Sequence, residues 1–448
     1  MFRATALSLI FLLPLLFVSP PAAAQINLDC PVSTLFGDDQ PSLVHISMTQ
    51  DSTEMQVTWS TGVQTDSEVE YGLDGNLDQF ASGSYSCYDY DMVFHSVTMT
   101  GLEPNSNYSY RVGNGEEWSS TYAFNTIPES AQSVKFLAFG DHGLSSEGLQ
   151  TSDNILNSDA DFLILSGDIS YANGDQSVWD DYFQENEASM ATFPWMMVPG
   201  NHENEPSYGF DAYETRLEFP SDSNTDLWHS FVRGPVHFTG FSTEHDFAVG
   251  SPQYEWLMQD LAAANASRDT VPWLVVYGHK PMYTSHGESN HDIDEQLRAE
   301  LEPLFVEYGV DILIWGHDHF YERTWPVIDS TVQDRGEDGL SFTSDAAPIH
   351  IIAGTAGRGS YDYTSEQPEW VYYREKSFGM MVITANHDVM TVEYHTHEGT
   401  ITDSFKIHQN KIFVEEASDG LLPGPHMLLT LLAVTLAAAR GRESPDEA

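Results

Sequence analysis

Five short motifs between residues 140 and 319 each contain a side chain that can bind a metal ion. They are Gly140-Asp141-His142-Gly143, Gly167-Asp168-Ile169-Ser170-Tyr171, Gly200-Asn201-His202-Glu203, Val276-Tyr277-Gly278-His279 and Gly316-His317-Asp318-His319. Carboxylate, phenolate and carboxamide oxygens and imidazole nitrogens are all metal donors in proteins. A single motif of this kind could equally be a turn with a hydrogen-bonded histidine, but the ordered set of five predicts a metal centre.

A buried strand is expected just before the leading ligand of each motif. Continuous apolar runs predict strands at 134–139, 162–166, 195–198, 273–277 and 312–315, with another at 349–352. Ligands of an α/β sheet gather outside the carboxyl ends of its strands. A glycine stands directly before each leading ligand and allows a tight turn there. The five strand ends could therefore aim their ligands at one point.

Two domains are predicted. Helical periodicity at 176–190, 254–264 and 293–308, between the apolar strands, indicates an α/β layered domain over residues 133–410. Within it, residues 378–408 are expected to form two or three strands that complete a sheet. Residues 41–127 instead alternate apolar and polar side chains in short runs, at 43–47, 55–59, 67–71, 95–99 and 108–112. That segment resembles a fibronectin-type all-β sandwich, and we expect it to be a structural appendage.

The N-terminus predicts export. Residues 1–24 contain Arg3, an apolar run at 6–18 and the small residues Ala22 to Ala24, the pattern of a secretory signal. Asn107 and Asn265 begin N-glycosylation triplets. Only Cys30 and Cys87 remain in the mature chain, where they form either one disulfide bond or two free thiols.

The charge balance limits the partners. Seventeen Lys and Arg against 68 Asp and Glu give a net charge of −51, which excludes nucleic-acid binding through a basic surface. A substrate phosphate would need a local positive centre, and metal ions would provide one. In the tail, 411–448, the apolar stretch 427–439 is short for a membrane span, so we expect no stable span. This segment is either a processed lipid anchor or a disordered or truncated tail.

From about residue 40 to 410, the motifs resemble the purple acid phosphatases of the calcineurin-like metallophosphoesterase superfamily. Most of that superfamily has a histidine two residues after the first aspartate, but this chain has Gly143 there and Tyr171 in the second motif. That exchange indicates the purple acid phosphatase branch. Further similar stretches are Tyr254-Glu-Trp-Leu-Met-Gln-Asp-Leu, His279-Lys-Pro-Met-Tyr, Tyr321-Glu-Arg-Thr and Pro348-Ile-His-Ile-Ile-Ala-Gly. The implied fold is the β-sandwich followed by a four-layer α/β (α+β) metallophosphoesterase domain.

The resemblance also implies a ligand set for two metal ions. Fe(III) would be held by Asp141, Asp168, Tyr171 and His319. Asp168 would bridge to one divalent ion, Fe, Zn or Mn, which is also held by Asn201, His279 and His317. These donor types are chemically sensible, because carboxylates and a phenolate suit a hard trivalent ion while imidazoles suit a divalent one.

The implied activity is an acid phosphatase that hydrolyses small phosphate monoesters with metal-bound hydroxide as the nucleophile. His202 would lie beside the phosphate and assist the leaving group, with Glu203 orienting it. A second phosphate-binding histidine is expected at His286 or His291, with a slight preference for His291. His142 is expected to be a neighbour of the centre and not a ligand.

Two alternatives compete with this function. A phosphodiesterase, nucleotidase or protein phosphatase could use the same scaffold, but those enzymes usually have a histidine where this chain has Gly143. A secreted binding protein over a dead phosphatase domain should have lost a ligand, and none is lost. The expected location is extracellular, with a lipid-anchored surface form or an acidic vacuolar or lysosomal compartment as alternatives. No oligomeric state is indicated.

Overall fold

The structure is a computed structural model that describes residues 30–287, 295–336, 339–344 and 347–409. The expected secretory signal, His291 and the C-terminal tail lie outside these residues. Within the described part of the chain, no helix is long and apolar enough to cross a membrane.

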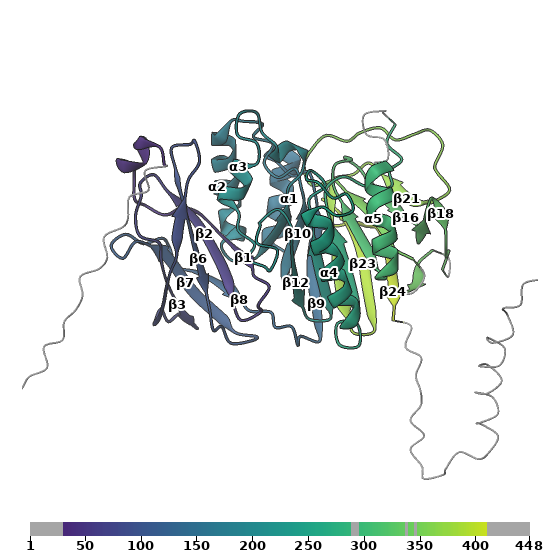
Figure 1. Cartoon of the computed structure of the whole chain (residues 1–448), viewed down its shortest axis with the longest axis horizontal. Coiled ribbons are helices and arrows are strands. Elements are labelled where there is room, and N and C mark those ends of the chain that lie inside the picture. The colour runs from purple at the N-terminus through teal and green to yellow at the C-terminus, as the bar shows by residue number, and fades with distance from the viewer. Residues whose placement is uncertain (1–29, 288–294, 337–338, 345–346, 410–448) are drawn as a thin grey trace, which may run out of the picture. The chain divides into compact units, whose positions relative to one another are not determined.

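Residues up to about 125 form a sandwich of two antiparallel sheets (Figure 1). One sheet has the order β1 (Ser42–Met48), β2 (Met55–Thr61), β6 (Val93–Met99), β5 (Ser84–Ser86). The other has the order β4 (Gln79–Ser82), β3 (Glu68–Leu73), β7 (Asn107–Gly113), β8 (Tyr122–Asn125). The sandwich predicted from the alternating pattern is confirmed.

A disulfide bond between Cys30 and Cys87 ties the segment before the sandwich to its first sheet. The short 3₁₀ helix η1 (Val32–Leu35) follows the first of these cysteines. Of the two states left open by the sequence, the structure therefore has the bonded one. Both cysteines lie far along the chain from the five motifs.

The rest of the described chain is built on two seven-stranded sheets. The first has the order β11 (Trp195–Val198), β10 (Phe162–Ser166), β9 (Ser133–Phe139), β22 (Gly379–Asn386), β23 (Val389–Thr396), β24 (Ile401–His408), β19 (Ser341–Thr343). The second has the order β12 (His229–Arg233), β13 (Val236–Gly240), β14 (Trp273–Tyr277), β15 (Ile312–Trp315), β20 (Ile349–Ala353), β16 (Tyr321–Thr324), β21 (Val371–Glu375). A small ribbon pairs β17 (Val327–Ile328) with β18 (Thr331–Val332).

Successive side chains of a strand point to opposite faces of its sheet, so the contacts of these side chains show what packs on each face. Phe136 of β9 packs edge-on against Phe238 of β13 at 5.0 Å between ring centroids, so these faces of the two sheets meet. On the opposite face of the second sheet, Val276 and Trp315 share a core cluster with Leu261 and Phe305. The helices on that face are α4 (Pro252–Ala266) and α5 (Glu295–Glu307).

The outer face of the first sheet is covered by α1 (Ser146–Leu156) and α2 (Gln176–Met190), with the short α3 (Asp211–Arg216) following in the chain. Asn154 of α1 borders a recess that Leu137 of β9 also lines. Helix, sheet, sheet and helix layers therefore follow one another, and the predicted four-layer domain is confirmed.

The sandwich packs against the α2 and α3 side of this domain. Tyr110 of β7 donates a hydrogen bond to the carbonyl of Ala191 at 2.7 Å. The buried Arg216 donates to Asp180 at 2.8 Å and to Tyr88 of the sandwich at 2.9 Å. These contacts hold the sandwich without contributing any group to the five motifs.

Candidate metal centre

The five motifs come together where the carboxyl ends of both sheets meet. β9, β10 and β11 are parallel neighbours in the first sheet, and β14 and β15 are parallel neighbours in the second. The first three motifs follow the former strands and the last two follow the latter. The centre is thus built by both sheets, as the positions of the motifs after the strands predicted.

One group of donor atoms combines two acidic oxygens with an imidazole. The Tyr171 hydroxyl lies 3.0 Å from Oδ1 of Asp141 and 3.3 Å from Nε2 of His319. That nitrogen is in turn 3.2 Å from Oδ1 of Asp141. All three side chains are buried. We call this set the tyrosine cluster.

A second group combines a carboxamide oxygen with two imidazoles. Oδ1 of Asn201 lies 3.0 Å from Nε2 of His279 and 2.9 Å from Nδ1 of His317. The two imidazole nitrogens are 3.2 Å apart. Oδ1 of Asp168 lies 3.2 Å from the same nitrogen of His279. We call Asn201, His279 and His317 the amide cluster, with Asp168 beside it.

These distances fit metal ligation. Donor atoms that share one ion at bond lengths of about 2.1 Å are separated by about 3 to 3.4 Å, depending on the coordination geometry. Both clusters show that spacing, and the nearby ligand atoms of Asp141, Asp168 and His279 also gather as a buried group that could hold an ion. The donor spacing is therefore compatible with metal ligation at both clusters, and Asp168 lies beside His279 and near Asp141.

The backbone at the ligands is held in an uncommon conformation. Four of the seven predicted ligands have positive φ, namely Asp141 (62°), Asp168 (55°), Tyr171 (58°) and His317 (69°). Residues other than glycine rarely adopt this region, at a cost of about 1 to 2 kcal/mol each. Such strain persists only where surrounding contacts fix it, and it is typical of functional sites.

Hydrogen bonds between loops fix that backbone. The amide of Asp141 donates to the carbonyl of Gly167 at 3.1 Å, and the amide of Gly143 donates to the carbonyl of Ile169 at 2.8 Å. The amide of His317 donates to Oδ2 of Asp141 at 2.8 Å, which joins the last motif to the first. Three strand ends are therefore locked together around the ligands.

Close approach explains the glycines before the ligands. A Cβ atom on Gly200 would lie 2.3 Å from Oδ1 of Asp168, and one on Gly316 would lie 2.7 Å from Oδ2 of Asp141. Any side chain at either position would displace a predicted ligand. The need for glycine is therefore steric at these two positions.

Backbone carbonyls fix the orientation of two ligand imidazoles. Nδ1 of His279 is 2.8 Å from the carbonyl of Ser166, and Nδ1 of His319 is 2.9 Å from the carbonyl of Gly359. A carbonyl oxygen only accepts, so each Nδ1 carries the proton and each Nε2 presents its lone pair to the centre. Such outer contacts are a regular feature of metal-binding histidines.

Glu203 has a different role from the one expected. Its buried carboxylate accepts hydrogen bonds from the backbone amides of Asp168 (2.9 Å), Ile169 (2.9 Å) and Gly200 (2.7 Å). It therefore braces the turns that carry Asp168 and Asn201. The expectation that Glu203 orients His202 is wrong.

Asn173 orients His202 instead. Nδ1 of His202 lies 2.6 Å from Oδ1 of Asn173, whose Nδ2 donates to the carbonyl of Tyr171 at 2.8 Å. Because that carbonyl fixes which end of the amide is the donor, His202 must donate from Nδ1. Its Nε2 then faces the centre, 3.8 Å from Oδ2 of Asp168, on a side chain that is one-third exposed.

The Gly143 exchange is explained by the space around Tyr171. A Cβ on Gly143, where φ is +68°, would lie 3.1 Å from the Tyr171 ring and 3.8 Å from Cδ of Arg358. The Arg358 guanidinium lies over that ring, 4.1 Å from its centroid. The His202 ring is 4.4 Å from the same centroid. Tyr171 and Arg358 thus occupy the space next to Gly143.

Two further histidines of the described chain, His286 and His142, lie outside both clusters. The buried His286 packs edge-on against Tyr361 at 5.0 Å, and Tyr361 stacks on His319 at 4.0 Å, so one ring separates His286 from the nearest ligand. His142 contacts the Tyr182 hydroxyl at 2.7 Å and the carbonyl of Gly148 at 3.0 Å, away from the ligand atoms. The choice between His286 and His291 as phosphate-binding residue stays a prediction.

The buried carboxylates of the centre shift the pKa values of the groups around them. Burial, together with the nearby Asp168 carboxylate, raises the pKa of Glu203 to about 8. Burial also raises the pKa of Asp168, although neighbouring histidines oppose it. Burial lowers the pKa of His279, but the Asp168 and Asp141 carboxylates outweigh it and raise the value to about 9. These shifts reflect the carboxylate charge gathered at the centre, which bound cations would neutralise.

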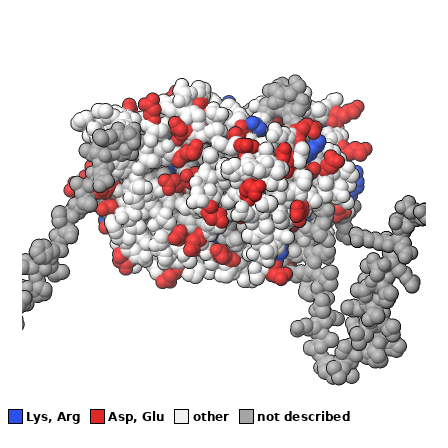
Figure 2. All heavy atoms as spheres, in the orientation of Figure 1, with Lys and Arg blue, Asp and Glu red and all other residues white. Residues whose placement is uncertain are grey.

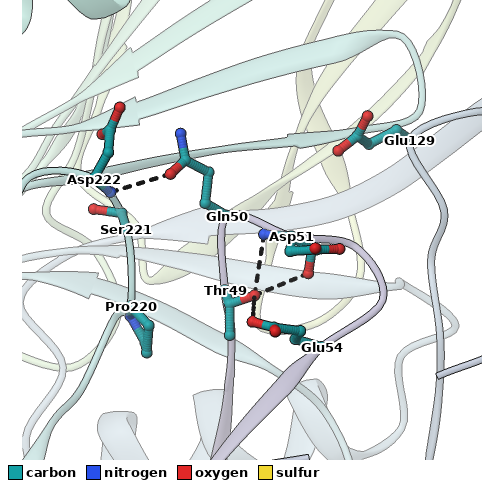
Figure 3. A pocket seen from close by; sticks show the side chains of 8 residues that line it. All are labelled: Thr49, Gln50, Asp51, Glu54, Glu129, Pro220, Ser221 and Asp222. Atoms are coloured by element: carbon teal, nitrogen blue, oxygen red, sulfur yellow. Dashed lines mark hydrogen bonds between the residues drawn. The ribbon is translucent and has the colours of Figure 1, made fainter. Parts of the chain in front are cut away.

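A surface recess elsewhere in the molecule has carboxylates but no histidine among its lining residues. A recess of about 600 Å³ between the sandwich and residues 220–222 is bordered by Asp51, Glu54, Glu129 and Asp222 (Figure 3). No histidine borders it, and its carboxylates would repel a phosphate. The acidic hollow therefore offers no substrate site for a phosphoester.

Family models match most of the described chain. Residues 41–126 match the N-terminal domain of purple acid phosphatase, 134–321 match calcineurin-like phosphoesterase, and 347–404 match the iron/zinc purple acid phosphatase-like protein C. Purple acid phosphatase 18 of Arabidopsis thaliana is 33% identical over 78% of this chain and 80% of its own length. This chain belongs to the purple acid phosphatase family. The resemblance inferred from the motifs is confirmed.

Other relatives show the range within the family. Acid phosphatase type 7 of Homo sapiens is 35% identical over 71% of this chain and 78% of its own length. The purple acid phosphatase PPD1 from yellow lupin (Lupinus luteus) seeds has a similar solved structure, with a TM-score of 0.76 and 25% identity over 83% of this chain and 75% of its own. Probable inactive purple acid phosphatase 1 of Arabidopsis thaliana is 30% identical over 83% of this chain and 69% of its own length. Family membership alone therefore does not show whether this chain is active. The residues of the site are the evidence for activity.

Two residues at the centre were missed by the sequence reasoning. Asn173 lies two positions after Tyr171 in an Ala-Asn-Gly turn, where an asparagine at positive φ is a recognisable local signal. Arg358 lies far along the chain from Tyr171, in a Gly-Arg-Gly stretch of irregular backbone after β20. Only the fold brings it to the ring.

Proposed function

We propose that this protein is an acid phosphatase that hydrolyses phosphate monoesters with a dinuclear Fe(III) and divalent metal centre. The observation that carries the proposal is the pair of donor clusters, each with metal-like spacing, with Asp168 beside His279 and near Asp141. No predicted ligand has been lost from either cluster. A dead domain with only a binding role would have no reason to keep a strained ligand backbone.

The donor chemistry supports a different ion in each cluster. Asp141 and Tyr171 would supply anionic oxygens to a trivalent ion, together with His319, and the neutral donors of the amide cluster would hold Fe, Zn or Mn as the divalent ion. When bound, two such ions lower the pKa of water to supply hydroxide and neutralise charge on the phosphoryl oxygens. A trivalent ion does so at lower pH than a divalent one, which supports activity in acid.

His202 would act on the substrate directly. Its Nε2 faces the centre, and its Nδ1 proton is held by Asn173. When protonated at Nε2 as well, it could donate a hydrogen bond to the phosphoryl group or a proton to the departing alcohol oxygen. Its side chain is one-third exposed, which leaves room for the alcohol part of the ester.

We extend the proposal to substrate and setting. Small phosphomonoesters are the expected substrates, and the N-terminal signal pattern supports an extracellular or acidic compartment. The high acidic charge would keep the exported protein soluble in that setting. A phosphodiesterase or nucleotidase on the same scaffold is the alternative that the assay below separates.

The test is hydrolysis of a small aryl phosphate against pH by wild type and His202→Ala, with the corresponding aryl phosphodiester measured in parallel. Wild type should cleave the monoester best in acid, and the variant should be slower by roughly 10²-fold or more with its metal content intact. Equal rates in the two proteins would remove His202 from the mechanism. Preferential cleavage of the diester would favour the alternative.

A further inference from the structure

Arg358 stands out among the basic side chains of this acidic protein. Figure 2 shows acidic side chains spread over the visible face with few basic ones between them. Most described basic side chains are paired with carboxylates, as in Arg111–Glu70, Lys135–Asp159, Arg216–Asp180, Arg268–Asp311, Lys280–Glu244, Arg298–Glu295, Arg323–Asp403 and Lys376–Asp362. Arg358 is exposed, and no carboxylate of the described residues forms an ion pair with its guanidinium.

The backbone that carries Arg358 is fixed to the metal-ligand loops. Its own amide donates to the carbonyl of Asp141 at 3.2 Å, and the amide of Ala356 donates to the carbonyl of Gly140 at 3.2 Å. On the other side, the amide of Tyr361 donates to the carbonyl of His319 at 3.2 Å. The backbone of Arg358 is therefore held at the edge of the centre, and its guanidinium lies over the Tyr171 ring.

The Arg358 guanidinium and His202 lie against the ring of the same predicted ligand, Tyr171. The guanidinium carbon and the His202 ring lie 4.1 Å and 4.4 Å from the centroid of the same Tyr171 ring. Tyr171 itself belongs to the tyrosine cluster, and His202 faces the alcohol side of the ester under the proposed function. An ester whose organic part extends past the Tyr171 ring would meet Arg358 there.

We propose that Arg358 binds a second anionic group of the substrate, so that the enzyme favours phosphate esters that carry a carboxylate or a further phosphate. A planar guanidinium with unused donors matches such groups in bidentate fashion. The inference rests on the proposed function for the orientation of the ester. It adds a basis for selectivity that the metal ions alone, which recognise the phosphoryl group, do not supply.

The test compares two ligands that differ by one carboxylate, methylphosphonate and phosphonoacetate, by titration calorimetry on the metal-loaded full chain. Wild type, Arg358→Gln, Arg358→Lys and Arg335→Gln are measured. The last is a matched control, because Arg335 is also exposed and lies over an aromatic ring, that of Trp325 at 5.0 Å, which belongs to no predicted ligand.

Arg358→Gln should weaken phosphonoacetate binding roughly tenfold and methylphosphonate binding less than twofold, since a hydrogen bond to a charged group is lost only with the former. Arg358→Lys should restore part of the loss, and Arg335→Gln should change neither. Equal weakening of both ligands by Arg358→Gln, or no weakening of either, would overturn the proposal. Turnover of an aryl phosphate by the wild type is measured alongside: its absence would count against the proposed function, while the ligand comparison still decides the role of Arg358.

Discussion

The tyrosine cluster and the amide cluster differ in charge and in exposure. Asp141, Tyr171 and His319 are buried, and Arg358 and Tyr361 lie over two of their rings. In the amide cluster only His279 is fully buried, while Asn201 and His317 are half-buried. The first cluster suits an ion that is held tightly, and the second suits one that exchanges. The carboxylate of Asp168 lies beside His279 of the second cluster and near Asp141 of the first.

The largest loss of metal binding and activity is expected from a substitution at Asp168. Asp168→Asn keeps a residue type that tolerates positive φ but removes the charge next to both clusters, so both ions should bind poorly and phosphatase activity should fall to the buffer blank. Metal analysis and turnover are the measurements. Asp222→Asn in the acidic hollow is the control and should change neither. Full metal content and activity in Asp168→Asn would contradict the shared role.

The difference in exposure between the two clusters can be tested without a mutation, by removing the metal ions with a chelator. Brief treatment with a chelator should remove the divalent ion and most activity while the visible colour of the protein persists, because a chelator reaches the half-exposed amide cluster first. Adding back Fe(II), Zn(II) or Mn(II) should restore turnover. Loss of colour and activity at the same rate would show that the two clusters do not differ as proposed.

A substitution at Glu203 tests how much its hydrogen bonds to the ligand-bearing turns contribute to metal binding. Glu203→Gln places an amide NH₂ where three backbone amides need an acceptor, and outer contacts of this kind are worth roughly 10- to 100-fold in metal affinity or activity. The control is Glu205→Gln, a buried carboxylate that accepts from Trp179 at 2.9 Å and braces no ligand. Equal loss of metal affinity in both variants would assign the effect to general destabilisation.

A smaller effect is expected at Asn173. Asn173→Gly keeps the positive φ of 52° but removes the acceptor for His202, so kcat should fall about tenfold with metal content and colour unchanged. Asn224→Gly is the matched control, since Asn224 also has positive φ (56°) and donates to a backbone carbonyl, that of Asp222. A fall in metal content instead of kcat would place Asn173 with the ligands and not with His202.

The sequence predicted the layers well because apolar runs dominate them. The strands at 162–166, 195–198, 273–277 and 312–315 and the helix at 176–190 lie where they were expected. Helix α1 was not predicted, because its buried residues are Gly148, Thr151 and Ile155, and two of these give no apolar signal. The motifs also predicted which strand ends would meet.

The contacts around the ligands could not be predicted in the same way. Glu203 follows His202 in the sequence, which suggested a partnership, but its side chain turns back to the amides of Asp168 and Gly200. The stacking of Arg358 on Tyr171 depends on how β20 and the loop after it pass the centre. Such contacts depend on the three-dimensional path of loops, which local sequence patterns do not encode.

In the proposed centre, the Tyr171 phenolate would bind the ferric ion. The most direct test is the visible spectrum of the purified protein with its iron content, for wild type and Tyr171→Phe. The wild type should show a charge-transfer band that the variant lacks, because phenylalanine keeps the ring under Arg358 and removes only the oxygen. A wild-type protein that is colourless and free of iron, or a band unchanged in Tyr171→Phe, would contradict it.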